Sequence, residues 1–340
     1  MKVLLTWFPP ADELEQIRAG MPKGTEVVAP KPRPVLSPYE ATAADIEDHI
    51  GDADVIIGQV MPAGSWDKAK KLKALVWLHT GVQEMPFQLL KQRGIQLANT
   101  KGANDIPVAE HAFCLLMTLA KKLIVRHENV LEARWTPFWE PENQGMLLEG
   151  RTMAILGLGT IGTKIAKRAK AFGMRVVGLR RHPEKGGSEF VDALYGPKDM
   201  HKMLGQGDII VVVTPLTEET TGFIDDAAIR AMKPTALLIN IGRGNLIQEH
   251  PLYVALMEKR LGGFASDVWW HYINAIPTTY HFATPSRTNL QHLPNVVCTG
   301  DQASRVPETR GRMIQMGIES AAAFIRGEPM PRSVNLDLGY

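Results

Sequence analysis

Short apolar runs alternate with helical patterns over the first hundred residues. The runs have the length of buried strands, and the segments between them, such as 41–51, carry helical spacing. This alternation predicts a parallel β-sheet that is covered by helices. The expected strands are KVLLTWF, EVVAP, DVIIGQ, ALVWLH and IQLANT.

A long helical pattern follows this first series. It covers residues 108–133 without glycine or proline, and the Asn104-Asp105 pair and Pro107 supply start signals ahead of it. The segment Trp135–Trp139 breaks the pattern with aromatic residues and proline.

A second α/β series runs from Thr152 to about Cys298, and another long helix is expected over 307–327. The chain has 340 residues, which is more than one hydrophobic core usually serves. We therefore expect an α/β protein with two Rossmann-like domains, each a parallel sheet with helices on both faces.

Composition excludes several classes of partner. The chain is 45% hydrophobic and 22% charged, and 38 basic residues against 36 acidic ones leave a net charge of +2 without a long basic run. Nucleic acid and anionic membranes are therefore poor candidates. No apolar stretch reaches the roughly eighteen residues of a membrane helix, and the N-terminal run is too short for a signal peptide, so we expect a cytoplasmic protein. Cys114 and Cys298 both lie in apolar runs and are expected to be reduced, buried thiols.

The stretch TMAILGLGTIGTKIAKRAKAFGMRVVGLRR joins a strand, a glycine loop, a helix and a second strand in about thirty residues. In the motif, Gly157 permits a tight turn, Gly159 lets the backbone approach a pyrophosphate, and Gly162 lets helix and strand pack closely. The helix N-terminus at Thr160 and Ile161 offers free N–H groups to phosphates. This spacing predicts a dinucleotide site.

The second strand ends in Arg180 and Arg181, where an NAD enzyme would carry an acid for the adenosine ribose. Two arginines can instead bind a 2′-phosphate through charge-assisted hydrogen bonds, which favours NADP as the cofactor. The alternative is that both arginines are solvated and that the cofactor is NAD, held by other contacts.

Three further stretches resemble the D-isomer-specific 2-hydroxyacid dehydrogenases. They are NTKGANDIPVAEHAFCLLMTLA, VVVTPLTEETTGFI, and ALLINIGRGNLIQEHPLYVALMEKRLGGFASDVW, and MPRSVN near the C-terminus is similar as well. The resemblance covers nearly the whole chain. It implies that the cofactor domain, 104–303, is inserted in a substrate domain formed by 1–103 plus 304–340.

The resemblance also implies roles for individual residues. Arg243 would bind the substrate carboxylate and polarise the 2-oxo group, as its planar, permanently charged fork allows. Thr80 and Gly81 would hold the other carboxylate oxygen through backbone N–H groups. Cofactor contacts are implied at Thr214, Pro215, Thr220, Ile241, Gly242 and Asp267, with Ile241 and Asp267 fixing the nicotinamide.

The chain departs from the family at the acid–base pair. Five residues after Asp267, where the family has glutamate, stands Tyr272, and Thr299-Gly300-Asp301 replaces the family's TPH motif. The segment between them is longer by about ten residues, an unusual length for a simple connection. An ordinary aspartate is ionised at neutral pH, so protonating Asp301 there would require its pKa to rise by about 3 units.

Three sources of the proton therefore remain open. They are Asp301, the Tyr272 hydroxyl, and a histidine of the longer loop, which is His271, His281 or His292. Alternatively, Asp301 is ionised and pairs with a cationic or neutral polar group of the substrate.

We expect an oxidoreductase that transfers a hydride between a nicotinamide cofactor and a 2-hydroxy or 2-oxo acid. The alternative is a cofactor-binding sensor or interaction protein that has lost efficient catalysis. The long helix and the Trp135–Trp139 segment correspond to the region through which the family forms homodimers, so we also expect a homodimer.

Overall fold

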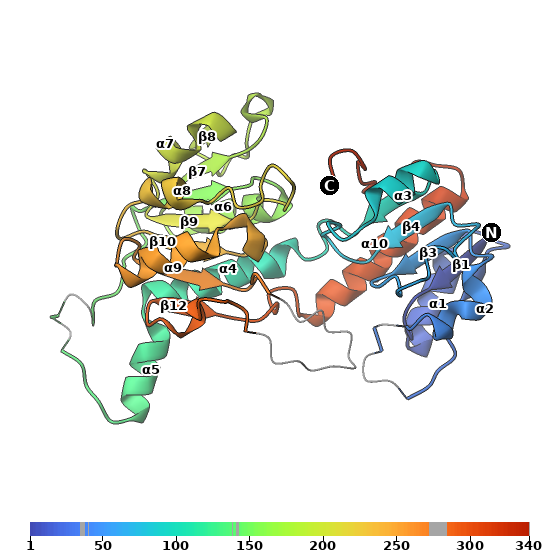
Figure 1. Cartoon of the computed structure of the whole chain (residues 1–340), viewed down its shortest axis with the longest axis horizontal. Helices are drawn as coiled ribbons and strands as arrows, with labels where there is room; N and C mark the ends of the chain where they lie inside the picture. Colours follow the sequence, from blue (N-terminus) through green and yellow to red (C-terminus); the bar gives the residue numbers. More distant parts are fainter. Residues whose placement is uncertain (35–37, 40, 138, 141–142, 272–283, 340) are drawn as a thin grey trace. The chain divides into compact units, whose positions relative to one another are not determined.

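The computed structural model describes residues 1–34, 38–39, 41–137, 139–140, 143–271 and 284–339. The chain divides into two compact units. The first unit consists of Met1–Asn104 and residues 306–339, and the second consists of residues 105–271 and 284–305. The second unit is thus inserted between the two segments of the first (Figure 1).

The first unit is built on a five-stranded parallel sheet in the order β2-β1-β3-β4-β5. All five strands expected from the sequence are present. They are β1 (Lys2–Leu5), β2 (Glu26–Val28), β3 (Val55–Gly58), β4 (Ala74–Trp77) and β5 (Gln96–Asn99).

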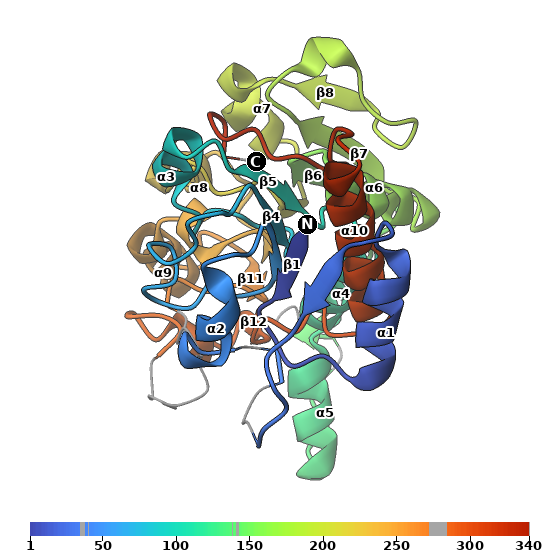
Figure 2. The same cartoon turned by 90° about the vertical axis from the view of Figure 1, so that its right-hand side faces the viewer.

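Helices cover both faces of this sheet. Figure 2 shows α1 (Ala11–Gly20) and α10 (Pro307–Ile325) on one face, and α2 (Glu47–Ile50) and α3 (Phe87–Gln92) on the other. Side chains alternate along each strand, so Val3 and Leu5 pack with α1 and α10, whereas Leu4 packs with α2 and α3.

The second unit contains a seven-stranded parallel sheet in the order β12-β11-β10-β9-β6-β7-β8. The strand order reverses between β6 and β9, which makes their carboxyl ends the switch point where such folds bind dinucleotides. The strands are β6 (Thr152–Leu156), β7 (Arg175–Leu179), β8 (Ala193–Tyr195), β9 (Ile209–Val212), β10 (Leu237–Asn240), β11 (Gly263–Ser266) and β12 (Val296–Cys298).

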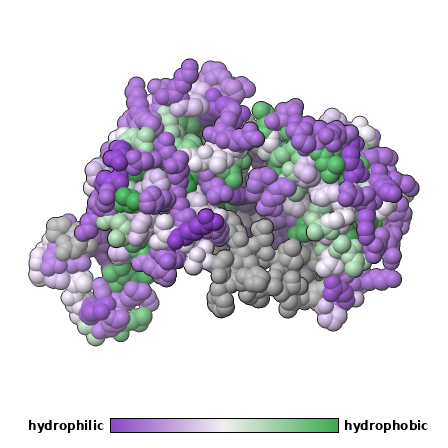
Figure 3. All heavy atoms as spheres, viewed as in Figure 1, coloured by the Kyte–Doolittle hydropathy of each residue, from purple (hydrophilic) through white to green (hydrophobic). Residues whose placement is uncertain are grey.

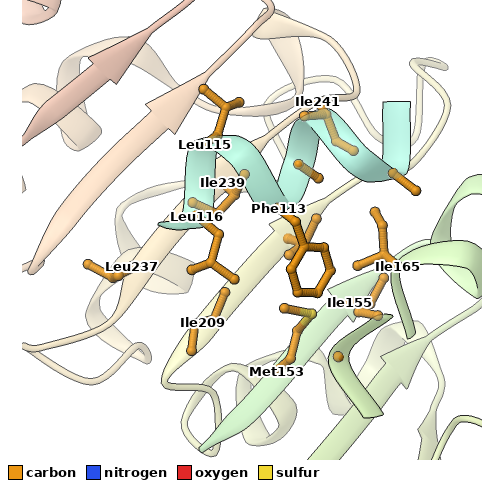
Figure 4. Packing of buried hydrophobic residues seen from close by; sticks show 14 of the residues in the cluster. Phe113, Leu115, Leu116, Met153, Ile155, Ile165, Ile209, Leu237, Ile239 and Ile241 are labelled. Carbon is orange, nitrogen blue, oxygen red and sulfur yellow. The ribbon is translucent and has the colours of Figure 1, made fainter. Parts of the chain in front are cut away.

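Two layers of helices enclose the second sheet. On one face, Phe113, Leu115 and Leu116 of α4 (Asp105–Ala120) pack over strand residues such as Ile209 and Ile239 (Figure 4), next to α6 (Thr160–Ala171). The other face packs against α7 (Met200–Leu204), α8 (Asp226–Arg230) and α9 (Glu249–Met257). The predicted fold class, two parallel sheets each with helices on both faces, is confirmed.

The prediction of one unbroken helix over 108–133 is wrong. Helix α4 begins at Asp105, where the start signals lie, but it ends at Ala120, and α5 (Leu123–Leu131) follows. Lys122 has a left-handed backbone with φ 52°. The carbonyl of Ala120 accepts from the N–H of Met146 at 2.8 Å, so a returning loop takes an acceptor that a continuous helix would use.

The cysteines also differ from the expectation. Cys114 and Cys298 are unpaired, as expected, but both are exposed rather than buried. Each lies in an apolar run, yet its own position points away from the core. Among the described helices, none is long and apolar enough to cross a membrane.

Candidate functional site

The predicted site residues of the second unit follow the carboxyl ends of its strands. Parallel strands end at the same edge of a sheet, so these residues share one edge. In chain order they follow β6, β7, β9, β10, β11 and β12, respectively: Gly157, Arg180, Thr214, Arg243, Asp267 and Asp301.

The glycine loop has the geometry of a tight turn from strand to helix. Gly157 has φ 109°, and a Cβ there would lie 3.0 Å from the backbone nitrogen of Thr214. A Cβ at Gly162 would overlap the carbonyl oxygen of Gly157, whereas a Cβ at Gly159 would meet nothing within 4 Å. Close packing thus requires Gly162, and open space lies beside Gly159 at the start of α6. That space and the free N–H groups of the helix suit a pyrophosphate.

Arg180 and Arg181 stand directly beside this loop. The last residue of β7 accepts a hydrogen bond from the N–H of Gly157 at 3.0 Å, and the two arginines follow it. Arg180 donates to the carbonyl of Gly186, and Arg181 pairs with Glu219 in the segment after β9. Both ion-pair partners are partly or largely exposed, so the pair contributes little stability.

The segments after β9 and β10 are held by short local bonds. The Thr214 hydroxyl donates to the last carbonyl of β6 at 2.8 Å, and the Thr220 hydroxyl donates to the carbonyl of Pro215 at 2.7 Å. The N–H of Ile241 donates to the last carbonyl of β9 at 3.1 Å, and a Cβ at Gly242 would lie 3.1 Å from the Thr214 carbonyl. These bonds fix the strand ends that border the switch point.

Arg243 follows β10 on a rigid turn. Asn240 donates to the Arg243 carbonyl at 3.0 Å, and the guanidinium donates to the Gly242 carbonyl at 2.8 Å. The next residue must be glycine, because a Cβ at Gly244 would overlap the backbone of Trp269. The side chain of Arg243 remains partly exposed at the sheet edge.

Asp267 is 2% exposed and lies at the centre of a ring of donors. Its Oδ1 accepts from the Thr299 hydroxyl at 2.6 Å and from the N–H of Gln302 at 2.9 Å, and its Oδ2 accepts from the N–H of Ala303 at 2.9 Å. Burial alone would raise the pKa of Asp267, but the nearby imidazole of His111 and the hydrogen bonds from Thr299 and the two N–H groups lower it below its ordinary value. The buried group is therefore an ionised carboxylate.

Asp301 lies on the loop that wraps Asp267, in a left-handed conformation with φ 55°. Its N–H donates to the Asp267 carbonyl at 2.9 Å, and its side chain is 63% exposed, 3.6 Å from the Arg305 guanidinium. Partial desolvation raises the pKa of the Asp301 carboxyl; Arg305 lowers it, Asp267 raises it, and Arg243 lowers it. The acid and Arg243 thus lie within electrostatic range of one another.

The other candidate proton donors are Tyr272 and three histidines. Tyr272 and His281 lie outside the described residues. His271 is partly exposed, and its Nε2 has no hydrogen-bond partner within the described part of the chain. His292 is exposed, at the end of a short 3₁₀ helix, Leu290–His292.

One residue of this site was missed by the sequence reasoning. His111, on α4, places its Nε2 2.8 Å from the Thr299 hydroxyl and 3.5 Å from Oδ1 of Asp267. The available signal was a single imidazole within the apolar run VAEHAFCLLMTLA. That signal is weak, because the partner residues are far away in the sequence.

The predicted substrate-binding pair of the first unit follows β4. The hydroxyl of Thr80 donates to the side-chain oxygen of Asn104 at 3.0 Å, and its carbonyl accepts from Asn99 at 2.8 Å. Among the described residues, neither the N–H of Thr80 nor that of Gly81 is used in a hydrogen bond. Both residues are partly exposed.

The model for D-isomer specific 2-hydroxyacid dehydrogenase, NAD binding domain, matches residues 113–301, which is more than half of the chain. The chain belongs to this family. A glyoxylate reductase of Korarchaeum cryptofilum is 32% identical over 302 residues, 86% of each chain, and one of Thermococcus litoralis is 31% identical over 80% of each.

Solved structures agree with this assignment. A D-isomer specific 2-hydroxyacid dehydrogenase family protein from Aeromonas salmonicida is 27% identical over 99% of each chain, with a TM-score of 0.81. An acyclic imino acid reductase, Bsp5, in complex with NADPH and D-Arg, shares the fold with a TM-score of 0.80 at 24% identity, over 98% of this chain and 100% of that one.

The enzyme is therefore an NAD(P)-dependent 2-hydroxyacid dehydrogenase. It transfers a hydride between a nicotinamide cofactor and a 2-hydroxy or 2-oxo acid. These relatives do not favour the alternative of a catalytically inactive sensor.

Proposed function

We propose that this enzyme reduces a small 2-oxo acid, with glyoxylate as the first candidate, and that Arg243 anchors the substrate. The observation that carries the proposal is the position of Arg243 after β10, at the strand edge that also carries the glycine loop. The names of the curated relatives support glyoxylate as the first acid to test. The first unit would then be the substrate domain, with Thr80 and Gly81 as donors to the carboxylate, and the second unit would be the dinucleotide-binding domain.

The residues of the second unit fit a dinucleotide. Gly159 leaves open space at the N-terminus of α6, where backbone N–H groups would hold the phosphates. The nicotinamide, when bound, supplies or accepts the hydride. Arg243 would bind the substrate carboxylate through its fork and, by its charge, favour negative charge on the 2-oxygen as the hydride arrives.

Arg243→Lys is the test of this role. Lysine keeps the charge but loses the two-pronged geometry, so we expect kcat/KM for glyoxylate to fall by about 100-fold, or roughly 3 kcal/mol. Arg230→Lys, on the exposed surface of α8, is the matched control. Turnover of glyoxylate, hydroxypyruvate and phenylpyruvate is followed by cofactor absorbance; unchanged rates in Arg243→Lys would remove this arginine from the mechanism.

For the cofactor, we propose NADP. Arg180 and Arg181 follow β7, and no carboxylate occupies Leu179-Arg180-Arg181-His182 to repel a 2′-phosphate. Arg180→Ala should weaken NADPH binding by about tenfold and leave NADH binding nearly unchanged, as measured by fluorescence titration. Tighter binding of NADH to the wild-type enzyme would instead assign NAD.

Asp301 supports a second candidate substrate. Its side chain is largely exposed beside Arg305, so it lacks the burial needed for the rise of about 3 units that protonation at neutral pH requires. An ionised Asp301 within electrostatic range of Arg243 would offer both a negative and a positive charge to a substrate, which matches a 2-imino acid with a protonated imine and a carboxylate. A hydride added to the carbon of that iminium gives a neutral amine, and no proton has to come from the protein.

The two candidates are separated by one assay. A 2-oxo acid is incubated with NADPH with and without ammonium, and the amino acid product is measured by chromatography. Amino acid formation that Asp301→Asn abolishes would support the imine; a hydroxy acid alone, formed equally fast by Asp301→Asn, would exclude it. If Asp301 instead gives the proton to the 2-oxo acid, the Asp301→Asn variant should form no hydroxy acid either.

We also propose that the enzyme is a homodimer of the cytoplasm. Apolar side chains are exposed on and after α5, including Leu131 at 71% and Trp135 at 87%. Figure 3 shows hydrophobic surface at the lower left, where α5 lies in Figure 1. Such a patch suits an interface. The two unpaired cysteines fit a reducing compartment. Light scattering should show a dimer that Leu131→Glu weakens; a monomeric wild-type protein would contradict the proposal.

A further inference from the structure

His111, Thr299 and Asp267 form a hydrogen-bonded chain whose direction can be deduced. Asp267 is an ionised carboxylate and can only accept hydrogen bonds. The Thr299 hydroxyl must therefore donate its single hydrogen to Oδ1 of Asp267, 2.6 Å away. The Thr299 oxygen must therefore accept from His111, whose Nε2 lies 2.8 Å away. The hydrogen of the imidazole thus sits on Nε2.

This chain makes the two oxygens of Asp267 unequal. A carboxylate oxygen has room for about two donors. Oδ1 already accepts from Thr299 and from the N–H of Gln302, and it has His111 at 3.5 Å. Oδ2 accepts only from the N–H of Ala303 within the described residues. The remaining acceptor site of this buried carboxylate is therefore on Oδ2.

We propose that His111 is a positioning residue for the cofactor. By donating through Nε2 it holds the Thr299 hydroxyl against Oδ1, and so would leave Oδ2 of Asp267 as the acceptor for the carboxamide N–H of a bound nicotinamide. The inference rests on the proposed placement of the cofactor along this edge. His111 acts through Thr299 and Asp267, and its effect needs a donor at Nε2 but no gain or loss of a proton.

Substitutions at His111 separate this role from two others. Glutamine can place a side-chain N–H near the position of Nε2 but cannot titrate, whereas leucine fills a similar volume without a donor. A positioning role predicts that His111→Gln retains function and that His111→Leu loses it. An acid–base role predicts that both lose it, and a packing role predicts that leucine is tolerated.

The first measurement needs no cofactor. Nitrogen-15 NMR of the imidazoles, recorded above the ordinary histidine pKa of about 6.5, reports which nitrogen carries the hydrogen. We expect the Nε2–H form for His111, and a more mixed signal in Thr299→Val, where the acceptor is gone. An Nδ1–H form in the wild-type protein would overturn the deduced chain and the proposal with it.

The second measurement separates the nicotinamide from the rest of the cofactor. NADPH is titrated beside 2′-phospho-ADP-ribose, which lacks the nicotinamide, or NADH beside ADP-ribose if that cofactor is preferred. His111→Leu and Thr299→Val should lose about tenfold in affinity for the whole cofactor but nothing for the fragment. His111→Gln and the exposed control His201→Gln should match the wild type in both titrations.

The outcomes are distinct. Equal losses for cofactor and fragment, or a loss in His111→Gln as large as in His111→Leu, would overturn the positioning role. If the wild-type enzyme binds the fragment as tightly as the whole cofactor, the contact from Asp267 to the carboxamide is wrong. If it binds neither, the proposed cofactor site itself is wrong, although the Nε2–H form of His111 would still be observed.

Discussion

The loops after β6 and β12 meet the same sheet edge but are held in different ways. Close backbone contacts hold the glycine loop, with Gly162 against the carbonyl of Gly157. The loop after β12 instead wraps the carboxylate of Asp267, which comes from the neighbouring strand end, and is tied to His111, 188 residues from Thr299. The first loop depends on glycines, where a side chain would clash. The second depends on a buried charge and on a donor that is far away in the sequence.

Two substitutions in the glycine loop test its stability and its cofactor binding separately. They should give the largest effects. Gly162→Ala would place a Cβ into the backbone of Gly157, so we expect a loss of about 3 kcal/mol in unfolding free energy. Gly159→Ala meets open space and should leave stability within about 0.5 kcal/mol while it weakens cofactor binding. Urea unfolding and cofactor titration check both variants. Equal stability of the two variants would contradict the steric account of this loop.

The loop after β12 should lose stability when the charge of Asp267 is removed, even if the packing is kept. Asp267→Asn keeps the shape but replaces one acceptor oxygen with a donor, so we expect a loss of about 2 kcal/mol at neutral pH. The pKa of Asp267 is lowered in the folded state, so its contribution is present above the ordinary value of about 3.9 and is lost as the pH falls through the folded-state pKa. Wild type and variant should therefore converge in acid.

The control for that series is Asp12→Asn on the exposed surface of α1. Urea midpoints of the three proteins are measured from neutral pH to about pH 3, below the ordinary carboxyl pKa. A constant difference between wild type and Asp267→Asn across this range would show that the charge of Asp267 does not stabilise the loop.

The contrast between the loops also explains what could be predicted from the sequence. The expected strands and the glycine loop were found because their signals are local: apolar runs, and glycines at fixed spacing between a strand and a helix. The end of α4 was missed, since the carbonyl of Ala120 is taken by Met146, a contact from beyond the segment in question. His111 was missed for the same reason, because its meaning depends on Thr299 and Asp267, which only the folded sheet brings to it.

Asp301 lies on the loop that wraps Asp267, but the two acids should respond to the same substitution with opposite signs. The folded-state pKa of Asp301 is raised, chiefly by partial desolvation, so its ionisation costs stability as the pH rises past the ordinary value of about 3.9. Asparagine avoids this cost and tolerates the left-handed backbone at this position. Asp301→Asn should therefore be neutral or more stable by up to about 0.5 kcal/mol at neutral pH, and equal to the wild type in acid. A clear loss of stability at neutral pH, measured by the same urea series, would mean that the Asp301 carboxylate is held by favourable charge contacts, and that it belongs with Asp267 rather than opposite to it.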